Sequence, residues 1–297
     1  MSKLVSVIIP TYNRIDTLER AIKSVKSQTY KNIEVLVIDD NANNHNIRKE
    51  VEKIVSKFQN IKLIQNKENL GGGLSRNEGI KNAKGEYIAF LDDDDEFYPE
   101  KIEKQYELYK KLNNDKVGLI YCYAKYVGSK SQIIRKVDYE GIPLKEHLVL
   151  CIAATSWWFC PKRVLEEIGG FEDVSSHQDA ITLFKILNAG YEIYRVPEVL
   201  LNYYIHSGTG ITKVSDEWMN IDKQYMEMYK KVENKFSDAD KKEIDYSFYR
   251  RASSYYYRLN NKIELKKSTK EMLKRYPFKY ETIKALIKTI LVKFKKG

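Results

Sequence analysis

The chain has 297 residues, of which 31% are charged and 43% hydrophobic, and its formal net charge is +10. These fractions are typical of a soluble globular protein with a sizeable core. The sequence contains no run of 18 or more apolar residues, the length needed to span a bilayer. Residues 261–297 carry eleven Lys and one Arg against three Glu, so nine of the ten net charges lie there. The nearly neutral remainder argues against nucleic-acid binding and for a basic appendage.

Cysteine usage and the first residues indicate the compartment. Cys122, Cys151 and Cys160 are odd in number and lack metal-ligand spacing, so we expect reduced, mostly buried thiols. Residues 1–6 enter a strand pattern at once, and we expect no signal peptide. Both features favour a cytoplasmic protein.

The first 125 residues alternate short apolar runs with helical patterns. One face of the first predicted helix, Thr17–Gln28, carries Leu18, Ala21, Ile22 and Val25. The predicted strands are Leu4–Pro10, Ile33–Asp39, Ile61–Gln65, Tyr87–Leu91 and Val117–Tyr123, and the helices are Thr17–Gln28, Ile47–Phe58, Leu74–Ala83 and Pro99–Leu112. This alternation predicts an α/β fold, with a doubly wound, mostly parallel sheet flanked by helices.

The pattern changes after about residue 126, where short strands, aromatic residues and loops run to about residue 213. Helical patterns follow at Val214–Val232, Ser237–Leu259 and Lys262–Arg275, and Pro277 separates the last of them from Tyr280–Lys296. We therefore predict two domains: residues 1–214, which hold the sheet, and residues 215–297, a basic helical C-terminal region.

Four consecutive aspartates, Asp92–Asp95, directly follow the apolar run Tyr87–Leu91. Open α/β sheets bind their ligands at the carboxyl ends of the strands. Neighbouring carboxylates repel one another, so we expect a cation to neutralise them. Oxygen ligands suit Mg²⁺ or Mn²⁺, which also bind phosphate oxygens, and the run therefore predicts a metal-bound phosphate ester as the ligand.

Two other predicted strands end in polar residues at the same edge of the sheet. The first strand leads into Thr11, Tyr12 and Arg14, and the second ends in Asp39 and Asp40. A single pair of this kind could be a helix cap or a loop. Their shared edge makes a common site the better explanation.

A glycine-rich segment, residues 69–79, precedes the strand that ends in the aspartates. Its glycines permit close approach of the backbone, and we expect the helix that follows to offer its N-terminus to an anion. Arg76, one turn into that helix, can reach a phosphate or a base edge. The segment matches neither the Walker pattern nor G-x-G-x-x-G, so its weight comes from its place beside the other strand ends.

Four segments, PTYNR, VIDDN, NLGGGLSRNEG and FLDDDD, together resemble glycosyltransferase family 2, the inverting enzymes of the GT-A fold. The resemblance covers roughly residues 3–210. It implies a Rossmann-like GT-A domain with a UDP-sugar as donor and Mn²⁺ or Mg²⁺ as cofactor.

The resemblance also implies roles at the nucleotide. Thr11, Tyr12 and Arg14 match the nucleotide-binding first loop of the family. Asp39 and Asp40 match the acidic pair that reads the uracil ring, with Asp40 favoured as the direct contact.

Further roles follow for the phosphate side of the site. Arg76 matches the arginine that lies beside the base and phosphates. Asp92, Asp93 and Asp94 match the D-x-D region, with Asp94 as the metal ligand and Asp93 near the ribose. Asp95 matches a capping residue that leads into the next helix.

Inversion needs a base on the sugar face opposite the leaving group, so we look for it far along the sequence from the aspartates. Asp179, at the start of a predicted helix, resembles the acid of the family's Glu-Asp motif. Gln178 stands where the family often has Glu, which leaves Asp179 as the candidate general base. An ordinary helix N-cap is the alternative.

Two more segments resemble the family. Trp157 and Trp158 lie in the acceptor-side segment, where they could stack on a sugar ring or be buried in the core. His206 matches a late histidine that approaches the pyrophosphate or the metal in relatives, so it is a candidate metal ligand. A structural role for His206 is the alternative.

The last segment, Tyr280–Lys296, has the pattern of a basic amphipathic helix. Its apolar residues at helical spacing are Ile283, Leu286, Ile287, Ile290 and Phe294, with lysines to one side. Such a helix predicts contact with a membrane surface. Packing on its own domain or on a partner subunit is the alternative, and the C-terminal helices could supply the interface of a homo-oligomer.

These features together predict a cytoplasmic glycosyltransferase, peripheral on the inner face of the cell membrane. It would move a sugar from a UDP-sugar to a hydroxyl of a glycan or lipid-linked saccharide during synthesis of a surface polysaccharide (capsule or cell wall). Three alternatives stay open: a non-catalytic nucleotide-sugar-binding partner in a glycan-assembly complex, a sugar-1-phosphate nucleotidyltransferase, and a transferase that acts on polyprenyl phosphate.

Overall fold

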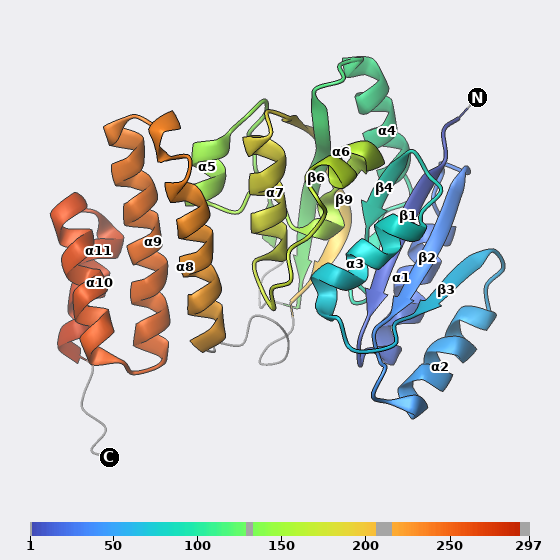
Figure 1. Cartoon of the computed structure of the whole chain (residues 1–297), viewed down its shortest axis with the longest axis horizontal. Coiled ribbons are helices and arrows are strands. Elements are labelled where there is room, and N and C mark those ends of the chain that lie inside the picture. Colours follow the sequence, from blue (N-terminus) through green and yellow to red (C-terminus); the bar gives the residue numbers. More distant parts are fainter. Residues whose placement is uncertain (1, 129–132, 206–215, 292–297) are drawn as a thin grey trace. The chain divides into compact units, whose positions relative to one another are not determined.

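The computed structural model describes residues 2–128, 133–205 and 216–291 (Figure 1). The chain forms two compact units, one of residues 1–144 and 151–208 and the other of residues 145–150 and 209–297. The predicted boundary at residues 214 and 215 lies outside the described residues, so the division at that point stays a prediction. The sequence did not indicate that residues 145–150 join the second unit.

One mixed sheet organises the first unit, and the described residues contribute nine strands to it, in the order β3-β2-β1-β4-β8-β6-β9-β5 with β7 paired to β6. The strands are β1 (Val5–Thr11), β2 (Ile33–Asp39), β3 (Ile61–Gln65), β4 (Tyr87–Phe90), β5 (Glu96–Phe97), β6 (Val117–Val127), β7 (Ile133–Arg135), β8 (Phe159–Pro161) and β9 (Glu192–Tyr204). The pairs β1–β2, β2–β3, β1–β4 and β6–β9 are parallel. β8 runs antiparallel between β4 and β6, and β5 and β7 are antiparallel edge strands.

The helices of the first unit cover this sheet (Figure 1). They are α1 (Ile15–Lys26), α2 (His45–Ser56), α3 (Gly71–Asn82), α4 (Lys101–Leu112), α6 (Lys162–Glu167) and α7 (Gln178–Asn188), with a 3-10 turn at Thr155–Trp157. The predicted inner face of α1 is buried through Leu18, Ala21, Ile22 and Val25, as the helical spacing requires. The predicted α/β fold is therefore confirmed, as a mixed sheet with flanking helices.

The second unit is helical, as predicted. Its elements are α5 (Leu144–Val149, of which residue 144 belongs to the first unit), α8 (Asp216–Lys230), a 3-10 turn at Glu233–Lys235, α9 (Asp238–Arg258), α10 (Lys262–Arg275) and α11 (Tyr280–Leu291). Side chains cap two of them: Ser237 accepts from the N–H of Asp240 at 3.2 Å, and Asn261 accepts from that of Glu264 at 3.1 Å. Within the described residues, no helix has both the length and the apolar character needed to cross a bilayer.

Buried side chains join the helices of the second unit. Met272 of α10 and Ala285 of α11 form one apolar cluster with Tyr246 of α9. The hydroxyl of Tyr246 is also 3.0 Å from that of Thr282, so the tyrosine-rich helix α9 uses its rings for helix packing, as predicted.

Candidate active site

The carboxyl ends of β1, β2 and β4 meet at one edge of the sheet. Thr11 and Asp39 are register partners at the ends of β1 and β2, and Asp92–Asp95 follows β4 at the same edge. The hydroxyl of Thr11 donates to Oδ2 of Asp93 at 2.8 Å. The structure thus brings together strand ends that lie 82 residues apart in the chain.

Three arginines surround the aspartate run. Arg14 forms an ion pair with Asp94, and Arg76 forms one with Asp92. The guanidinium of Arg20 donates to the backbone carbonyl of Asp94 at 2.6 Å. These cations offset the mutual repulsion of the carboxylates, which the sequence reasoning had assigned to a metal alone.

Burial controls the protonation of the run. It raises the pKa of Asp93 to about 7, against the opposing charge of Arg14. Burial also raises the pKa of Asp95 well above its usual range, and the negative charges of its neighbours act in the same direction. Among the described residues, buried Oδ2 of Asp95 has no hydrogen-bond partner. A buried acceptor of that kind calls for a ligand.

This geometry fits a divalent cation. Asp92, Asp94 and Asp95 each offer a carboxylate oxygen, and the three oxygens lie within 4.8 Å of one another. Oxygen donors are the ligands that Mg²⁺ and Mn²⁺ prefer, and a cation here would satisfy the orphaned oxygen of Asp95. The predicted metal ligand Asp94 thus belongs to the cluster.

The expected capping role of Asp95 is wrong. The run continues into β5, and α4 begins later, with Glu100 at its N-cap. Oδ1 of Asp95 instead accepts from the N–H of Tyr204 at 3.0 Å, a residue of β9. Because β9 lies 109 residues further along the chain, local sequence could not indicate this contact.

Asp40 organises the start of the glycine-rich helix. Its carboxylate accepts from the N–H groups of Leu70 and Gly71, both at 2.8 Å, and from the amide of Asn66 at 2.7 Å. As a result α3 begins at Gly71, where φ is +77°, rather than at the predicted Leu74. The positive φ explains the glycine at this position.

Asp39 is fully buried and has several partners. Its Oδ1 accepts from the side-chain amide of Asn41 at 2.7 Å and from the N–H of the same residue at 3.0 Å. Its Oδ2 accepts from Gln65 at 3.3 Å and lies 3.7 Å from Nε of Arg48. These contacts fix the loop that follows β2.

The guanidinium of Arg76 connects both halves of the site. Besides its ion pair with Asp92, it donates through Nη1 to Oε1 of Gln178 at 2.7 Å and to the carbonyl of Gly72 at 3.0 Å. Its side chain is almost completely buried, so its orientation is held by these partners.

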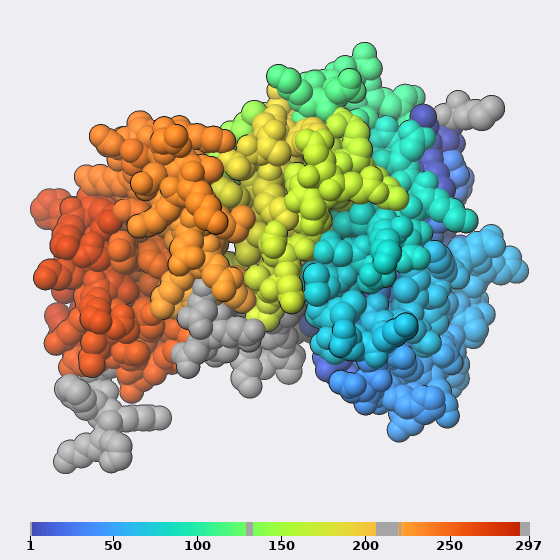
Figure 2. All heavy atoms as spheres, in the orientation of Figure 1, coloured from blue at the N-terminus to red at the C-terminus, as the bar shows by residue number. Residues whose placement is uncertain are grey.

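Helix α3 also packs closely on the segment before α7. Asn77 exchanges two hydrogen bonds with the backbone of Phe171, at 2.8 and 2.9 Å. A methyl group on Gly73 would lie 2.7 Å from the carbonyl oxygen of Glu172, so only glycine fits there. The surfaces of α3 and the neighbouring α6 adjoin in Figure 2, in cyan and yellow-green.

Asp179 lies in the first turn of α7 and is partly exposed. Its Oδ1 accepts from the N–H of Ala180 at 2.8 Å, and its Oδ2 is 3.7 Å from the thiol sulfur of Cys151. Removal from water raises the pKa of Asp179, against the opposing charges of His177 and Arg76. A partly exposed carboxylate with a raised pKa can accept a proton from a hydroxyl.

The remaining predicted residues differ in their surroundings. Tyr12 is 53% exposed. Trp157 and Trp158 are buried, so the core alternative is confirmed for both. His206 lies outside the described residues, and its role stays a prediction.

Several residues of the site were not predicted from the sequence, among them Asn66, Ser156, Tyr204 and the thiol of Cys151. Asn66 directly follows β3, so the strand-end rule that selected Asp40 would also have found it. The others come from distant segments, and only the folded chain brings them to the aspartates.

The family model for glycosyl transferase family 2 matches residues 6–169, more than half of the chain. The chain therefore belongs to this family, as its motifs predicted. It is 33% identical over 225 residues to an uncharacterized glycosyltransferase of Rickettsia felis, a match that covers 72% of this chain and 36% of that protein. A similar protein of Rickettsia prowazekii is 34% identical over 218 residues, 69% of this chain and 65% of that one. The chain thus spans between about a third and two thirds of the length of these relatives.

A third relative and two solved structures complete the comparison. The amylovoran biosynthesis glycosyltransferase AmsB of Erwinia amylovora is 27% identical over 238 residues, 74% of this chain and 78% of AmsB. The structure of TarS of S. aureus matches 97% of this chain and 54% of TarS with a TM-score of 0.66 at 19% identity. A structure of TarS 1–349 in complex with UDP-GlcNAc matches with a TM-score of 0.59 at 18% identity, over 97% of this chain and 81% of that one. The TM-scores establish a shared fold, and at identities this low the likeness shows the fold alone. The GT-A-like fold is therefore confirmed.

Proposed function

We propose that this protein transfers a sugar from a UDP-sugar to a hydroxyl of a glycan or lipid-linked saccharide during synthesis of a surface polysaccharide. The observation that carries the proposal is the single edge where the cluster of Asp92, Asp94 and Asp95 is joined to the helix of Asp179 through Arg76. A cation site for a diphosphate and a carboxylate for an acceptor hydroxyl are the two groups that such a transfer requires.

The donor would lie over the carboxyl ends of β1, β2 and β4. Tyr12 is exposed enough to stack on uracil. Oδ2 of Asp40 accepts the N–H of Gly71 and, with two lone pairs, retains one for the N3–H donor of the base. Asp39 and Thr11 support this loop, and Asp93 would face the ribose. The support for a uridine nucleotide is that TarS, which shares the fold, was solved with UDP and UDP-GlcNAc.

The phosphates of the donor would lie against Arg14, Arg76 and the metal. Asp94, together with Asp92 and Asp95, would hold Mn²⁺ or Mg²⁺, and His206 is a further candidate ligand. The cation, when bound, supplies positive charge to the departing diphosphate. Arg14 and Arg76 form ion pairs with carboxylates of the aspartate run, so their guanidinium groups lie close enough to donate hydrogen bonds to phosphate oxygens bound there.

Asp179 is the proposed general base. It takes the proton of the acceptor hydroxyl while that oxygen forms the new bond to the anomeric carbon, and the bond from this carbon to UDP breaks. UDP leaves with the electron pair, and the proton stays on the carboxyl group of Asp179 until solvent removes it. The raised pKa brings the carboxylate closer in basicity to the hydroxyl that it must deprotonate.

Helix α11 is the proposed contact with a membrane surface. Its buried residues are the small Thr282, Ala285 and Thr289, whereas its long aliphatic side chains point outward. Exposed aliphatic residues beside lysines are typical of an interfacial helix. The relative AmsB, named for amylovoran biosynthesis, supports the assignment to polysaccharide synthesis.

UDP release tests the proposal. The full chain is incubated with Mn²⁺, a panel of UDP-sugars, and free or lipid-linked oligosaccharide acceptors. We expect acceptor-dependent UDP release that Asp94→Asn and Asp179→Asn both abolish, while only Asp94→Asn impairs metal-dependent binding of UDP. Near-wild-type turnover in Asp179→Asn would overturn the assignment of the base. UDP-sugar binding without release in any combination would instead favour the non-catalytic partner.

A further inference from the structure

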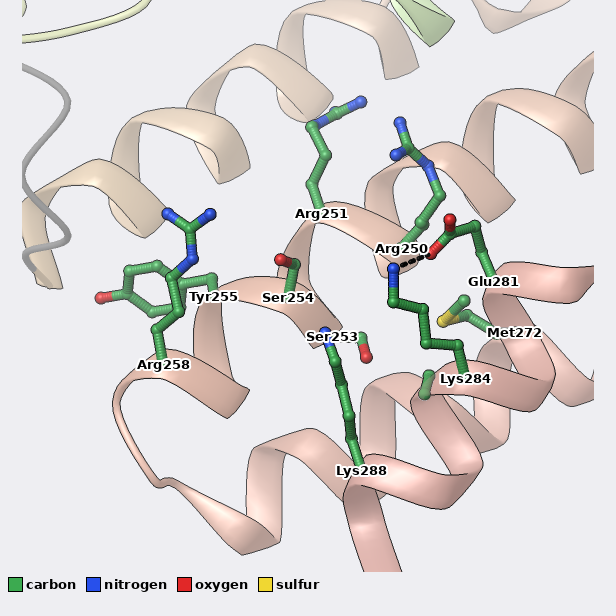
Figure 3. Close-up of a pocket in the computed structure, with 11 residues that line it drawn as sticks. Arg250, Arg251, Ser253, Ser254, Tyr255, Arg258, Met272, Glu281, Lys284 and Lys288 are labelled. Carbon is green, nitrogen blue, oxygen red and sulfur yellow. Dashed lines mark ion pairs between the residues drawn. The ribbon is translucent and has the colours of Figure 1, made fainter. Parts of the chain in front are cut away.

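A cavity of about 390 Å³ opens in the second unit, lined by α9, α10 and α11. Its lining includes five cations, Arg250, Arg251, Arg258, Lys284 and Lys288, against one carboxylate, Glu281. In Figure 3 the lysines extend from α11 toward α9, where Ser253 and Ser254 lie. The volume is within the range of small-molecule sites.

Carboxylates pair with only some of the cations that line this cavity. Arg251 forms an ion pair with buried Asp222 at 3.0 Å, and Lys284 is 3.9 Å from Glu281. Within the part of the chain that the structure describes, Arg250 and Arg258 have no carboxylate at ion-pair distance, and both are exposed. The lining offers arginine and lysine donors as well as serine hydroxyls, and these groups suit the oxygens of a phosphate group.

Helix α11 also carries an exposed aliphatic stripe. Ile283, Leu286, Ile287 and Ile290 are 46, 40, 51 and 72% exposed, and Leu291 extends the stripe. Lys284 and Lys288 each lie one turn before a member of the stripe, Ile287 and Leu291, so the cationic edge borders the apolar one. A ligand that joins a phosphate to acyl chains is complementary to both edges.

We infer that the cavity between α9 and α11 binds the phosphate of an anionic lipid headgroup while the stripe of α11 enters the lipid surface. The inference rests on the membrane contact proposed above and adds a specific headgroup site to it. A soluble phosphate would meet the cations equally well but would leave the stripe uncovered, which is why the lipid is favoured.

Vesicle sedimentation with the full chain tests this inference. The vesicles consist of phosphatidylcholine alone or of phosphatidylcholine with phosphatidylglycerol. We expect the wild type to bind the mixed vesicles and to bind the neutral ones at least tenfold more weakly. The variant Arg250→Gln/Lys284→Gln should lose about thirtyfold in affinity for the mixed vesicles, the loss expected for two cations that lie directly against anionic headgroups.

A matched control separates a site from diffuse charge. Lys266 and Lys270 are exposed on α10 and do not line the cavity, so Lys266→Gln/Lys270→Gln removes the same charge from the same unit. This control should lose less than threefold. Equal losses in both variants would overturn the headgroup site and leave only general attraction of a basic surface.

A second variant and a competitor identify the source of the phosphate. Ile287→Ser/Ile290→Ser should weaken binding to the mixed vesicles at least tenfold, and millimolar inorganic phosphate should not displace the wild type. Full displacement by inorganic phosphate, with no effect of the serine variant, would mean a soluble phosphate ligand and would contradict the inference. The assay contains no sugar donor or acceptor, so its failure is distinguishable from a failure of sugar transfer. Wild-type chain that binds neither kind of vesicle would overturn the membrane contact itself.

Discussion

The guanidinium of Arg76 donates to the side-chain carbonyl of Gln178 at 2.7 Å, across 102 residues of chain. The same guanidinium pairs with Asp92, and Gln178 directly precedes Asp179. The contact therefore sets the position of the proposed base relative to the proposed metal site. A glutamine is sufficient for this purpose, because the amide oxygen accepts from arginine and the amide nitrogen donates to the carbonyl of Val174 at 2.9 Å.

Loss of the Gln178 side chain should slow the reaction without much effect on donor binding. In Gln178→Ala a hydrogen bond to a charged group disappears, and such bonds contribute about 1.5–3 kcal/mol, so kcat should fall by about ten- to hundredfold. Gln178→Glu keeps the acceptor and should retain activity within about threefold. Steady-state kinetics with varied UDP-sugar would measure both. Equal kcat values for Gln178→Ala and the wild type would exclude the positioning role.

Replacement of Asp179 should remove catalysis and yet stabilise the protein. The loss of a general base costs about 10²–10⁴-fold in kcat. The pKa of Asp179 is raised in the folded state. At low pH the carboxyl group is protonated in both the folded and the unfolded state, and the protein has its full free energy of unfolding. This free energy falls as the pH rises through the folded-state pKa, because the buried carboxylate must then ionise. Asp179→Asn keeps a neutral side chain at all pH values. Its Tm should match that of the wild type near pH 4 and exceed it at pH 8. A lower Tm at pH 8 would contradict the direction of this pKa shift.

The activity profile should report the same group. The rate should rise with pH through an apparent pKa above about 4, the ordinary value for aspartate, because only the ionised carboxylate accepts a proton. Initial rates between pH 4 and 9, at saturating donor and Mn²⁺, measure this. A rate that is constant from pH 4 upward would exclude Asp179 as the group whose ionisation limits the reaction.

Cation binding should release protons. Burial raises the pKa of Asp93 to about 7, so its carboxyl group is partly protonated near neutrality, and burial raises the pKa of Asp95 well above its usual range. Mn²⁺ requires the ionised form of its ligand Asp95, and its charge also favours the ionised form of the neighbouring Asp93, so it should displace protons and bind more tightly as the pH rises from 6 to 8. Calorimetry in two buffers of different ionisation enthalpy would count the protons. Equal enthalpies in both buffers would mean that the carboxyl groups are already ionised.

The glycines at the start of α3 should differ in tolerance. Gly73→Ala places a methyl group 2.7 Å from a backbone oxygen, which cannot move easily, and we expect a destabilisation of about 1–3 kcal/mol with loss of UDP binding. In Gly72→Ala the nearest atoms are the side-chain ends of Gln178 and Arg76, at 3.1 and 3.2 Å, which can shift. That variant should keep its free energy of unfolding within about 1 kcal/mol of the wild type. It should lose activity, because the methyl group displaces the hydrogen-bonded side chains of Arg76 and Gln178. Thermal unfolding of both variants tests the contrast, and equal Tm losses would refute it.

The parallel half of the sheet was predictable because its signals are local. β2 and β3 have the bounds that their apolar runs predicted, and α10 has those of its helical spacing. By contrast, β9 is a strand of 13 residues where only short strands were expected. Its register against β6 jumps from Val196 to Val199, so Pro197, which lacks an N–H, lies outside the pairing. A strand with such an interruption has no continuous pattern in the sequence.

The site was predictable to the extent that it lies at strand ends. Thr11, Asp39 and the aspartate run follow from that rule, and the structure places them together. The contact of Asp95 with Tyr204 and that of Asp179 with Cys151 join segments that lie 109 and 28 residues apart, for which local sequence carries no signal. The motif resemblance supplied the base candidate, and the raised pKa of Asp179 is a property that only the fold reveals.

Calorimetric titration of UDP into the full chain tests the central claim most directly, namely that a divalent cation on the aspartate cluster holds a nucleotide diphosphate. UDP should bind in the presence of Mn²⁺, and its affinity should fall at least tenfold with a chelator or in Asp94→Asn. Absence of UDP binding under every metal condition, or equal affinity with and without the cation, would contradict the account.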